Sequence, residues 1–129
     1  KGELEAANDV PFVFVLFHYP IFNAHPRRPD NERLKQELHP VLRDYAVSAV
    51  FNGHDHYYYR TRREGVLYVI SGGGGAPLYD FDSNRVGPED VAKREHHYVR
   101  CIVHSDRVEA EVINLDGQVI DRFTIAARK

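Results

Sequence analysis

The chain has 129 residues, of which 43% are hydrophobic, and a formal net charge of −2 at pH 7. This length and apolar content fit one modest globular domain with a hydrophobic core. No basic block stands out, which argues against a nucleic-acid partner. The longest apolar run, residues 12–17, is far too short to cross a bilayer, so no membrane partner is expected either.

The first third of the chain predicts a strand, a helix and a second strand, after the end of a short helix. Both strand segments are β-branched and aromatic without polar alternation, which predicts that they are fully buried. Asp30 or Asn31 can cap the helix, and Pro40 either kinks it or begins a second short helix. The predicted segments are residues 4–7 for the first helix, 10–17 for the first strand, 21–30 for a loop, 31–45 for the second helix and 47–51 for the second strand.

The rest of the chain predicts antiparallel strands. Two strand segments joined at Glu64-Gly65 predict a hairpin, and the turn pairs Ser105-Asp106 and Asp116-Gly117 separate three more strands. The polar segment 77–95 has no assigned structure. The predicted strands are residues 57–63, 66–70, 97–104, 108–114 and 119–126, and a glycine run follows the second of them at 71–75.

Cys101 is the single cysteine, which excludes an internal disulfide. Because it lies in an apolar stretch, we expect a buried and unreactive thiol. The sequence opens Lys1-Gly2-Glu3, shows no signal-peptide pattern and contains no methionine. An internal fragment or a processed product would have these features, and they leave the cellular compartment undetermined.

Three histidines follow the two strands of the first third. His18 comes after the first strand, and His54 and His56 follow the second in the segment Asn52-Gly53-His54-Asp55-His56. A right-handed crossover makes the two strands parallel, so their carboxyl ends lie at one edge of the sheet. His54 and His56 point the same way in an extended loop, and Gly53 permits a turn there. The histidines are therefore expected at one rim.

Such a rim predicts a metal site. Neutral imidazole is the commonest side-chain metal ligand, and it suits zinc, iron, nickel or copper better than calcium or magnesium. A single histidine at a strand end is more often structural, and His-x-His pairs also arise by chance among eight histidines. The joint occurrence of three histidines at adjacent strand ends favours metal binding over a structural role.

The segments around these histidines resemble a known family. Phe17-His18-Tyr19-Pro20, Gly53-His54-Asp55-His56 and residues 68–75 look like the last motifs of the calcineurin-like metallophosphoesterases, in order and spacing. Tyr58 and Arg60 stand at the positions usual for the purple acid phosphatase branch. The resemblance covers nearly the whole chain. It implies half of a two-sheet α/β sandwich and the hydrolysis of phosphomonoesters by a metal-activated hydroxide.

The resemblance also implies that His18 and His54 bind one metal of a pair and that His56 binds the other, the metals being iron, zinc or manganese. The family's earlier motifs, D-x-H, G-D-x-x-D and G-N-H-D/E, do not occur in residues 1–129. The chain therefore resembles the C-terminal part of the domain. Three histidines cannot fill two metal sites, so the isolated chain is expected to be inactive, and no residue in it is assigned a catalytic role.

The missing motifs suggest a partner. Half of a sandwich exposes sheet edges and an apolar face, which we expect the missing N-terminal half of the domain or a second copy to cover. Relatives in this branch are often exported, but this chain carries no export signal of its own. A second reading is a non-catalytic metal-binding or interaction module. A cupin barrel is disfavoured because residues 57–60 are Tyr-Tyr-Tyr-Arg where cupins need a glutamate.

Other residues receive weaker assignments. His25 in the proline-rich loop either lines a substrate entrance or is solvent-exposed. Tyr58 and Arg60 are expected to support the histidine loop, as residues behind metal ligands do. Asp55 points away from its neighbours and is a poor bridging ligand. The glycine run lacks the Lys-Ser/Thr of a P-loop and is expected to allow close backbone approach beside the rim. The remaining histidines, His39, His96, His97 and His104, are read as structural or surface residues.

Overall fold

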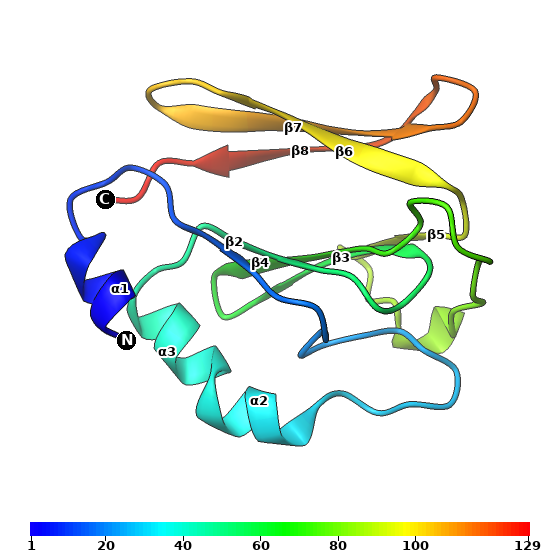
Figure 1. Ribbon diagram of the computed structural model, residues 1–129, viewed down its shortest axis with the longest axis horizontal. Helices are drawn as coiled ribbons and strands as arrows, with labels where there is room; N and C mark the ends of the chain where they lie inside the picture. The colour runs from blue at the N-terminus through cyan, green and yellow to red at the C-terminus, as the bar shows by residue number, and fades with distance from the viewer.

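The computed structural model describes residues 1–129 as two stacked β-sheets with helices on one outer side (Figure 1). A five-stranded mixed sheet lies between a three-stranded antiparallel sheet and the helices α2 and α3. This is the α/β, two-sheet arrangement that the sequence predicts. The helices are α1 (Gly2–Ala6), α2 (Glu32–Glu37) and α3 (His39–Asp44), with a 3-10 turn η1 (Ser83–Arg85). The strands are β1 (Phe14–Leu16), β2 (Ala49–Asn52), β3 (Tyr58–Arg63), β4 (Val66–Ser71), β5 (Val91–Lys93), β6 (His97–Val103), β7 (Arg107–Asn114) and β8 (Val119–Ala126).

The strand–helix–strand unit forms as predicted. In the five-stranded sheet the order is β1-β2-β4-β3-β5, and β1, β2 and β4 are parallel to one another. β3 runs antiparallel to β4, its hairpin partner, and to β5. The carboxyl ends of β1, β2 and β4 therefore lie at one edge of the sheet, which is the edge that carries the histidines.

Pro40 begins a second helix. The side chain of Asn31 accepts a hydrogen bond from the backbone N–H of Leu34 at 3.1 Å and caps α2. α2 then ends at Glu37, and Pro40 lies in the first turn of α3. A proline is tolerated there because the backbone N–H groups of a first turn have no partner inside the helix.

Apolar cores fill both layers, and two of the three clusters are the largest. The first lies between the sheets and joins β2, β3 and β4 to β7 and β8. The second lies between the five-stranded sheet and the helical side. His39 belongs to this second layer: its Nδ1 is 2.6 Å from the Tyr68 hydroxyl and its Nε2 is 2.8 Å from Glu64, which confirms its structural role. Burying an aliphatic or aromatic side chain in such a core contributes about 1.5–3 kcal/mol.

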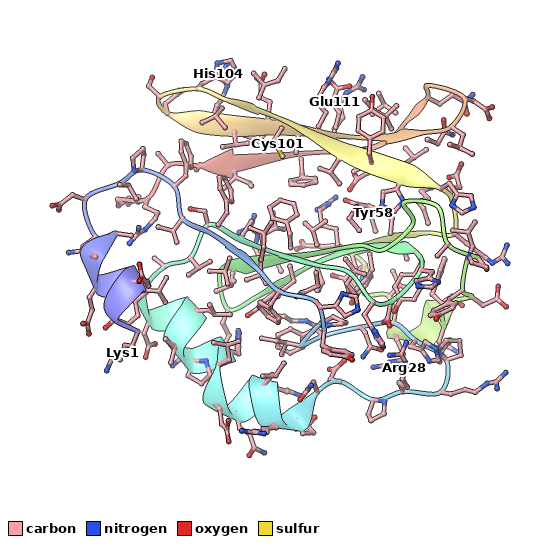
Figure 2. The ribbon with its side chains drawn as sticks, in the orientation of Figure 1. Lys1, Arg28, Tyr58, Cys101, His104 and Glu111 are labelled. Atoms are coloured by element: carbon pink, nitrogen blue, oxygen red, sulfur yellow. The ribbon has the colours of Figure 1, made fainter.

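A polar cluster joins the two sheets across the first core. Asp121 of β8 accepts a hydrogen bond from the Tyr58 hydroxyl at 2.6 Å and two from the Arg60 guanidinium, at 2.6 and 3.1 Å. Figure 2 shows Tyr58 between the two sheets. The side chains of Tyr58 and Arg60 thus tie β3 to β8, and neither bonds a histidine of the loop before β3.

Two expectations for these segments are wrong, and one segment without an assigned structure has some. The first strand is not fully buried: β1 covers only Phe14–Leu16, forms the edge of its sheet, and leaves Leu16 72% exposed. Cys101 is exposed rather than buried, because β6 is also an edge strand. Segment 77–95, left without structure, contains η1 and β5. An apolar run predicts a strand, but it does not distinguish a central strand from an edge strand, which has a neighbour on one side only.

The edges β1 and β6 open on the same side of the molecule, toward the viewer in Figure 1. Val103 of β6 is 61% exposed, although it pairs with the buried Val108 and so lies on the inward face of its sheet. Apolar side chains at unpaired edges favour the addition of further strands. None of the helices combines the length and the apolar character needed to cross a lipid bilayer.

Candidate metal centre

The histidine rim forms where β1 and β2 end. The backbone N–H of Gly53 donates to the carbonyl of His18 at 3.1 Å, which holds the two strand ends together. His54 has φ +66°, a left-handed conformation that few non-glycine residues adopt. Such strain is retained where the surrounding structure over-determines it, often at functional sites.

His18 and His54 face one another. The Nε2 atom of His18 lies 3.3 Å from the Nδ1 atom of His54, with the rings at 80°. Two nitrogens bound at about 2.0–2.1 Å to one tetrahedral zinc would be separated by about 3.3 Å, so the pair fits two ligands of a single cation. Burial, together with the positive charge of Arg28, lowers the pKa of His54. This favours the neutral imidazole that binds metals.

His56 is held apart from that pair. Its Nδ1 lies 2.8 Å from the backbone carbonyl of Pro77, to which it can donate only if the proton is on Nδ1. Its ring stacks on Tyr79, with centroids 4.1 Å apart. The Nε2 lone pair is then left for a ligand, as in metal-binding histidines whose other nitrogen is hydrogen-bonded. No three His, Cys, Asp or Glu side chains gather closely enough to hold one ion. The rim is thus arranged as two histidines plus one.

His25 lies at the same end of the molecule. Its Nδ1 accepts hydrogen bonds from the backbone N–H groups of Arg27 and Arg28, at 3.0 and 3.2 Å. The proton of the neutral ring is therefore on Nε2. Its ring meets Tyr79, the residue that stacks on His56, edge-to-face with centroids 6.0 Å apart. Burial and the charge of Arg28 lower the pKa of His25.

Asp55 anchors the loop from behind. Its carboxylate is fully buried and accepts hydrogen bonds from the Arg28 guanidinium and from the Tyr57 hydroxyl, the latter at 2.7 Å. The Tyr57 hydroxyl in turn accepts from the backbone N–H of Ala24 at 3.0 Å. Asp55 is thus occupied within the protein, as expected of a residue that is a poor bridging ligand. The sequence did not predict Arg28 and Tyr57 as its partners. The signal that could have indicated them is an acidic residue inside a histidine loop, because a buried carboxylate needs a cation.

The glycine run packs against this loop. A Cβ on Gly72 would lie 1.8 Å from the backbone oxygen of Asp55, and one on Gly73 would lie 2.6 Å from Nδ1 of His97. The backbone N–H of His97 donates to the carbonyl of Gly73 at 3.0 Å. The expected close backbone approach beside the rim is confirmed.

Buried His97 fixes the other side of the run. Its Nδ1 is 2.8 Å from the Glu95 carbonyl, which places the proton on Nδ1 and leaves Nε2 to accept from the Ser71 hydroxyl at 3.0 Å. Tyr58 packs edge-to-face on the ring. The hydrogen bond from Ser71 uses the Nε2 lone pair of a neutral imidazole, whereas the one to Glu95 would persist in a protonated ring. Burial lowers the pKa of His97.

A pH dependence of stability follows. The unfolded chain has an ordinary histidine pKa of about 6.5, above that of folded His97, so it takes up the proton first as the pH falls. The contribution of His97 is therefore present above about pH 6.5 and is lost as the pH falls toward the folded pKa. We expect urea unfolding at pH 7 and pH 5 to show a smaller loss of stability for His97→Gln than for the natural chain. The partly exposed His104→Gln is the control; an equal loss in both variants would contradict the assignment.

No family model matches the chain. Among curated proteins, purple acid phosphatase 1 of Ipomoea batatas is 33% identical over 83 residues, which cover 61% of this chain and 18% of that protein. Human tartrate-resistant acid phosphatase type 5 is 40% identical over 75 residues, which cover 57% of this chain and 22% of that protein. The chain resembles the purple acid phosphatases. It spans less than a quarter of the length of these two phosphatases.

Two solved structures share the fold. Purple acid phosphatase PPD1 from yellow lupin seeds has a TM-score of 0.76 at 20% identity, over 97% of this chain and 27% of that one. GAP50, the anchor in the inner membrane complex of Plasmodium, has a TM-score of 0.81 at 17% identity, over 98% of this chain and 40% of that one. At these identities the likeness concerns the fold alone. The two sheets are consistent with half of a metallophosphoesterase sandwich. The sequence motifs around the three histidines predict the same fold.

Proposed function

We propose that the chain supplies three metal ligands of a dinuclear phosphoesterase that hydrolyses phosphomonoesters. The observation that supports this most is the His18–His54 pair, with nitrogens 3.3 Å apart at the ends of parallel strands. His56 is held separately by Pro77 and would serve the second metal. Purple acid phosphatase relatives support the same reaction class.

The residues present would contribute in distinct ways. His18 and His54 would hold one ion and the Nε2 atom of His56 the other; iron, zinc and manganese all accept such nitrogen ligands. Bound metals would polarise the phosphoryl oxygens and lower the pKa of a water molecule. The Nε2–H of His25 is free to donate a hydrogen bond to the substrate. Arg28 and Asp55 keep the histidine loop in place behind the metal positions.

The rest of the centre would come from outside residues 1–129. Two metal sites need more than three nitrogen ligands, and Asp55, the carboxylate of the histidine loop, is engaged with Arg28. The open edges β1 and β6 face the same side of the molecule. They would accept the strands of an N-terminal half of the domain, carried by the same protein or by a partner, or those of a second copy.

Metal content and hydrolysis of phenyl phosphate, measured together, test this proposal. The chain alone is expected to bind at most one metal weakly and to show no turnover. After addition of a polypeptide with the N-terminal metallophosphoesterase motifs, we expect two metals per complex and turnover. Turnover by the chain alone would show that other residues complete the site. Absence of metal from both samples would overturn the metal proposal.

A non-catalytic interaction module is the second candidate. The exposed apolar side chains along β1 and β6 favour it, because such surfaces mark protein contacts whether or not a metal binds. GAP50, of the same fold, is described as an anchor. This candidate gains support if the chain binds a partner stably while its histidines bind no metal.

A further inference from the structure

A pocket of about 210 Å³ adjoins His54. Its polar walls are Tyr19, Asn23, Arg28 and Asn31, and His54 also lines it. A water molecule occupies about 30 Å³ in the liquid, so the pocket has room for several heavy atoms. A substrate held at the histidine rim would therefore extend part of its structure into this pocket.

Arg28 is fixed in place before any ligand binds. Its guanidinium is paired with the fully buried Asp55, and its backbone carbonyl accepts from the guanidinium of Arg85. Figure 2 shows Arg28 on the side of the five-stranded sheet opposite the three-stranded sheet. Asp55 lies behind Arg28 and is its one side-chain acceptor, whereas the Arg28 side chain is 38% exposed. A guanidinium has five N–H donors, so several remain for a ligand.

The other polar walls also have unused donors. The Oδ1 of Asn31 caps α2, but its amide N–H groups have no protein acceptor. The Tyr19 hydroxyl has no hydrogen-bond partner within the protein, and its ring packs on His54 with centroids 4.5 Å apart. No carboxylate lines the pocket. Its chemistry suits oxyanions, because three side chains with unused donors line it and the Asp55 carboxylate lies behind Arg28.

We propose that Arg28, with Asn31 and Tyr19, binds an anionic group on the leaving-group part of the substrate. This rests on the proposed function, which puts the scissile phosphate at the histidines. Forked donation by a guanidinium suits a carboxylate or a second phosphate alike. The site would therefore favour phosphoesters whose leaving group carries its own negative charge over those with a neutral leaving group.

Direct binding to the 129-residue chain tests the pocket without metals or turnover. NMR titrations would use benzoate, phenylphosphonate and the neutral benzamide. We expect the two anions to shift the signals of Tyr19, Arg28 and Asn31, and benzamide to bind at least about fivefold more weakly. Tighter binding of benzoate would indicate a carboxylate, and tighter binding of phenylphosphonate a phosphate. Equal affinity for all three, or no binding, would overturn the proposal.

Variants must separate ligand binding from folding, because Arg28→Gln leaves Asp55 buried without a cation. The double variant Arg28→Gln/Asp55→Asn removes both charges, and Arg28→Lys keeps the charge without the fork. Both are expected to weaken anion binding by about fivefold to tenfold while remaining folded by circular dichroism. Arg27→Gln, outside the pocket, is the matched control. Undiminished anion binding in the folded double variant would contradict the role of Arg28.

Catalysis separates this inference from the proposed function. In the assembled, metal-loaded enzyme, kcat/KM for 4-carboxyphenyl phosphate should exceed that for phenyl phosphate, and Arg28→Lys should reduce the ratio toward one. Turnover of both esters at equal rates would count against the pocket alone. Loss of all turnover, with anion binding to the chain intact, would refute the metal proposal and leave the pocket standing.

Discussion

His54→Ala should remove one metal from the assembled phosphoesterase and reduce its turnover by on the order of 10²-fold or more. The size follows from the several kcal/mol that a metal ion contributes to stabilising charge on a phosphoryl group. His54 is the half of the 3.3 Å histidine pair that lies in a strained backbone conformation, so no neighbour can replace its nitrogen without rebuilding the loop. Metal analysis and phenyl phosphate turnover, measured on one preparation, check the result.

The control for this substitution is His104→Ala. His104 directly follows β6 and pairs with the exposed Glu109. Figure 2 shows it at the three-stranded sheet, on the opposite side of the molecule from Arg28. It should keep both metals and full turnover. If His54→Ala also kept both metals and full turnover, the histidine pair would be a structural contact. The proposal of a non-catalytic interaction module would then replace that of an enzyme.

The placement of His18 and His54 could be predicted because it depends on chain topology. Two apolar strands joined by a helix form a parallel pair with a right-handed crossover. Their carboxyl ends therefore lie at one edge of the sheet, whatever the conformation of the loops. The separate position of His56, away from the His18–His54 pair, depends instead on its contacts with Pro77 and Tyr79. These two residues lie in a segment whose sequence shows no helix or strand periodicity. Local patterns say nothing about which distant carbonyl a histidine will reach.

The partners of buried Asp55 show the same limit. Arg28 reaches it across 27 residues of sequence, and the contact exists because the 21–30 loop folds back beneath the sheet. The error over β1 has a different cause. A strand that is apolar on both faces fits a central position and an edge equally well, and only the identity of its neighbours decides between them.

Gly72→Ala should destabilise the chain by about 3–5 kcal/mol, which for a domain of this size lowers Tm by roughly 10–20 °C. The reason is steric: its Cβ would lie 1.8 Å from the backbone oxygen of Asp55, and backbone cannot rotate away as a side chain can. Gly72 has no positive φ, so conformational freedom is not what requires a glycine there. Thermal unfolding followed by circular dichroism measures the shift.

Gly74→Ala provides the matched control. Gly74 lies two residues further along the run, has no positive φ, and would place its Cβ with no atom within 4 Å, so the change should stay within about 0.5 kcal/mol. Similar losses in both variants would mean that the run matters through its flexibility and not through contact with Asp55.

The contact between Gly72 and Asp55 also links stability to the proposed reaction. The backbone that Gly72 touches carries His54 and His56 on either side of Asp55, so a Gly72→Ala chain that still folds should bind metal more weakly than the Gly74→Ala chain.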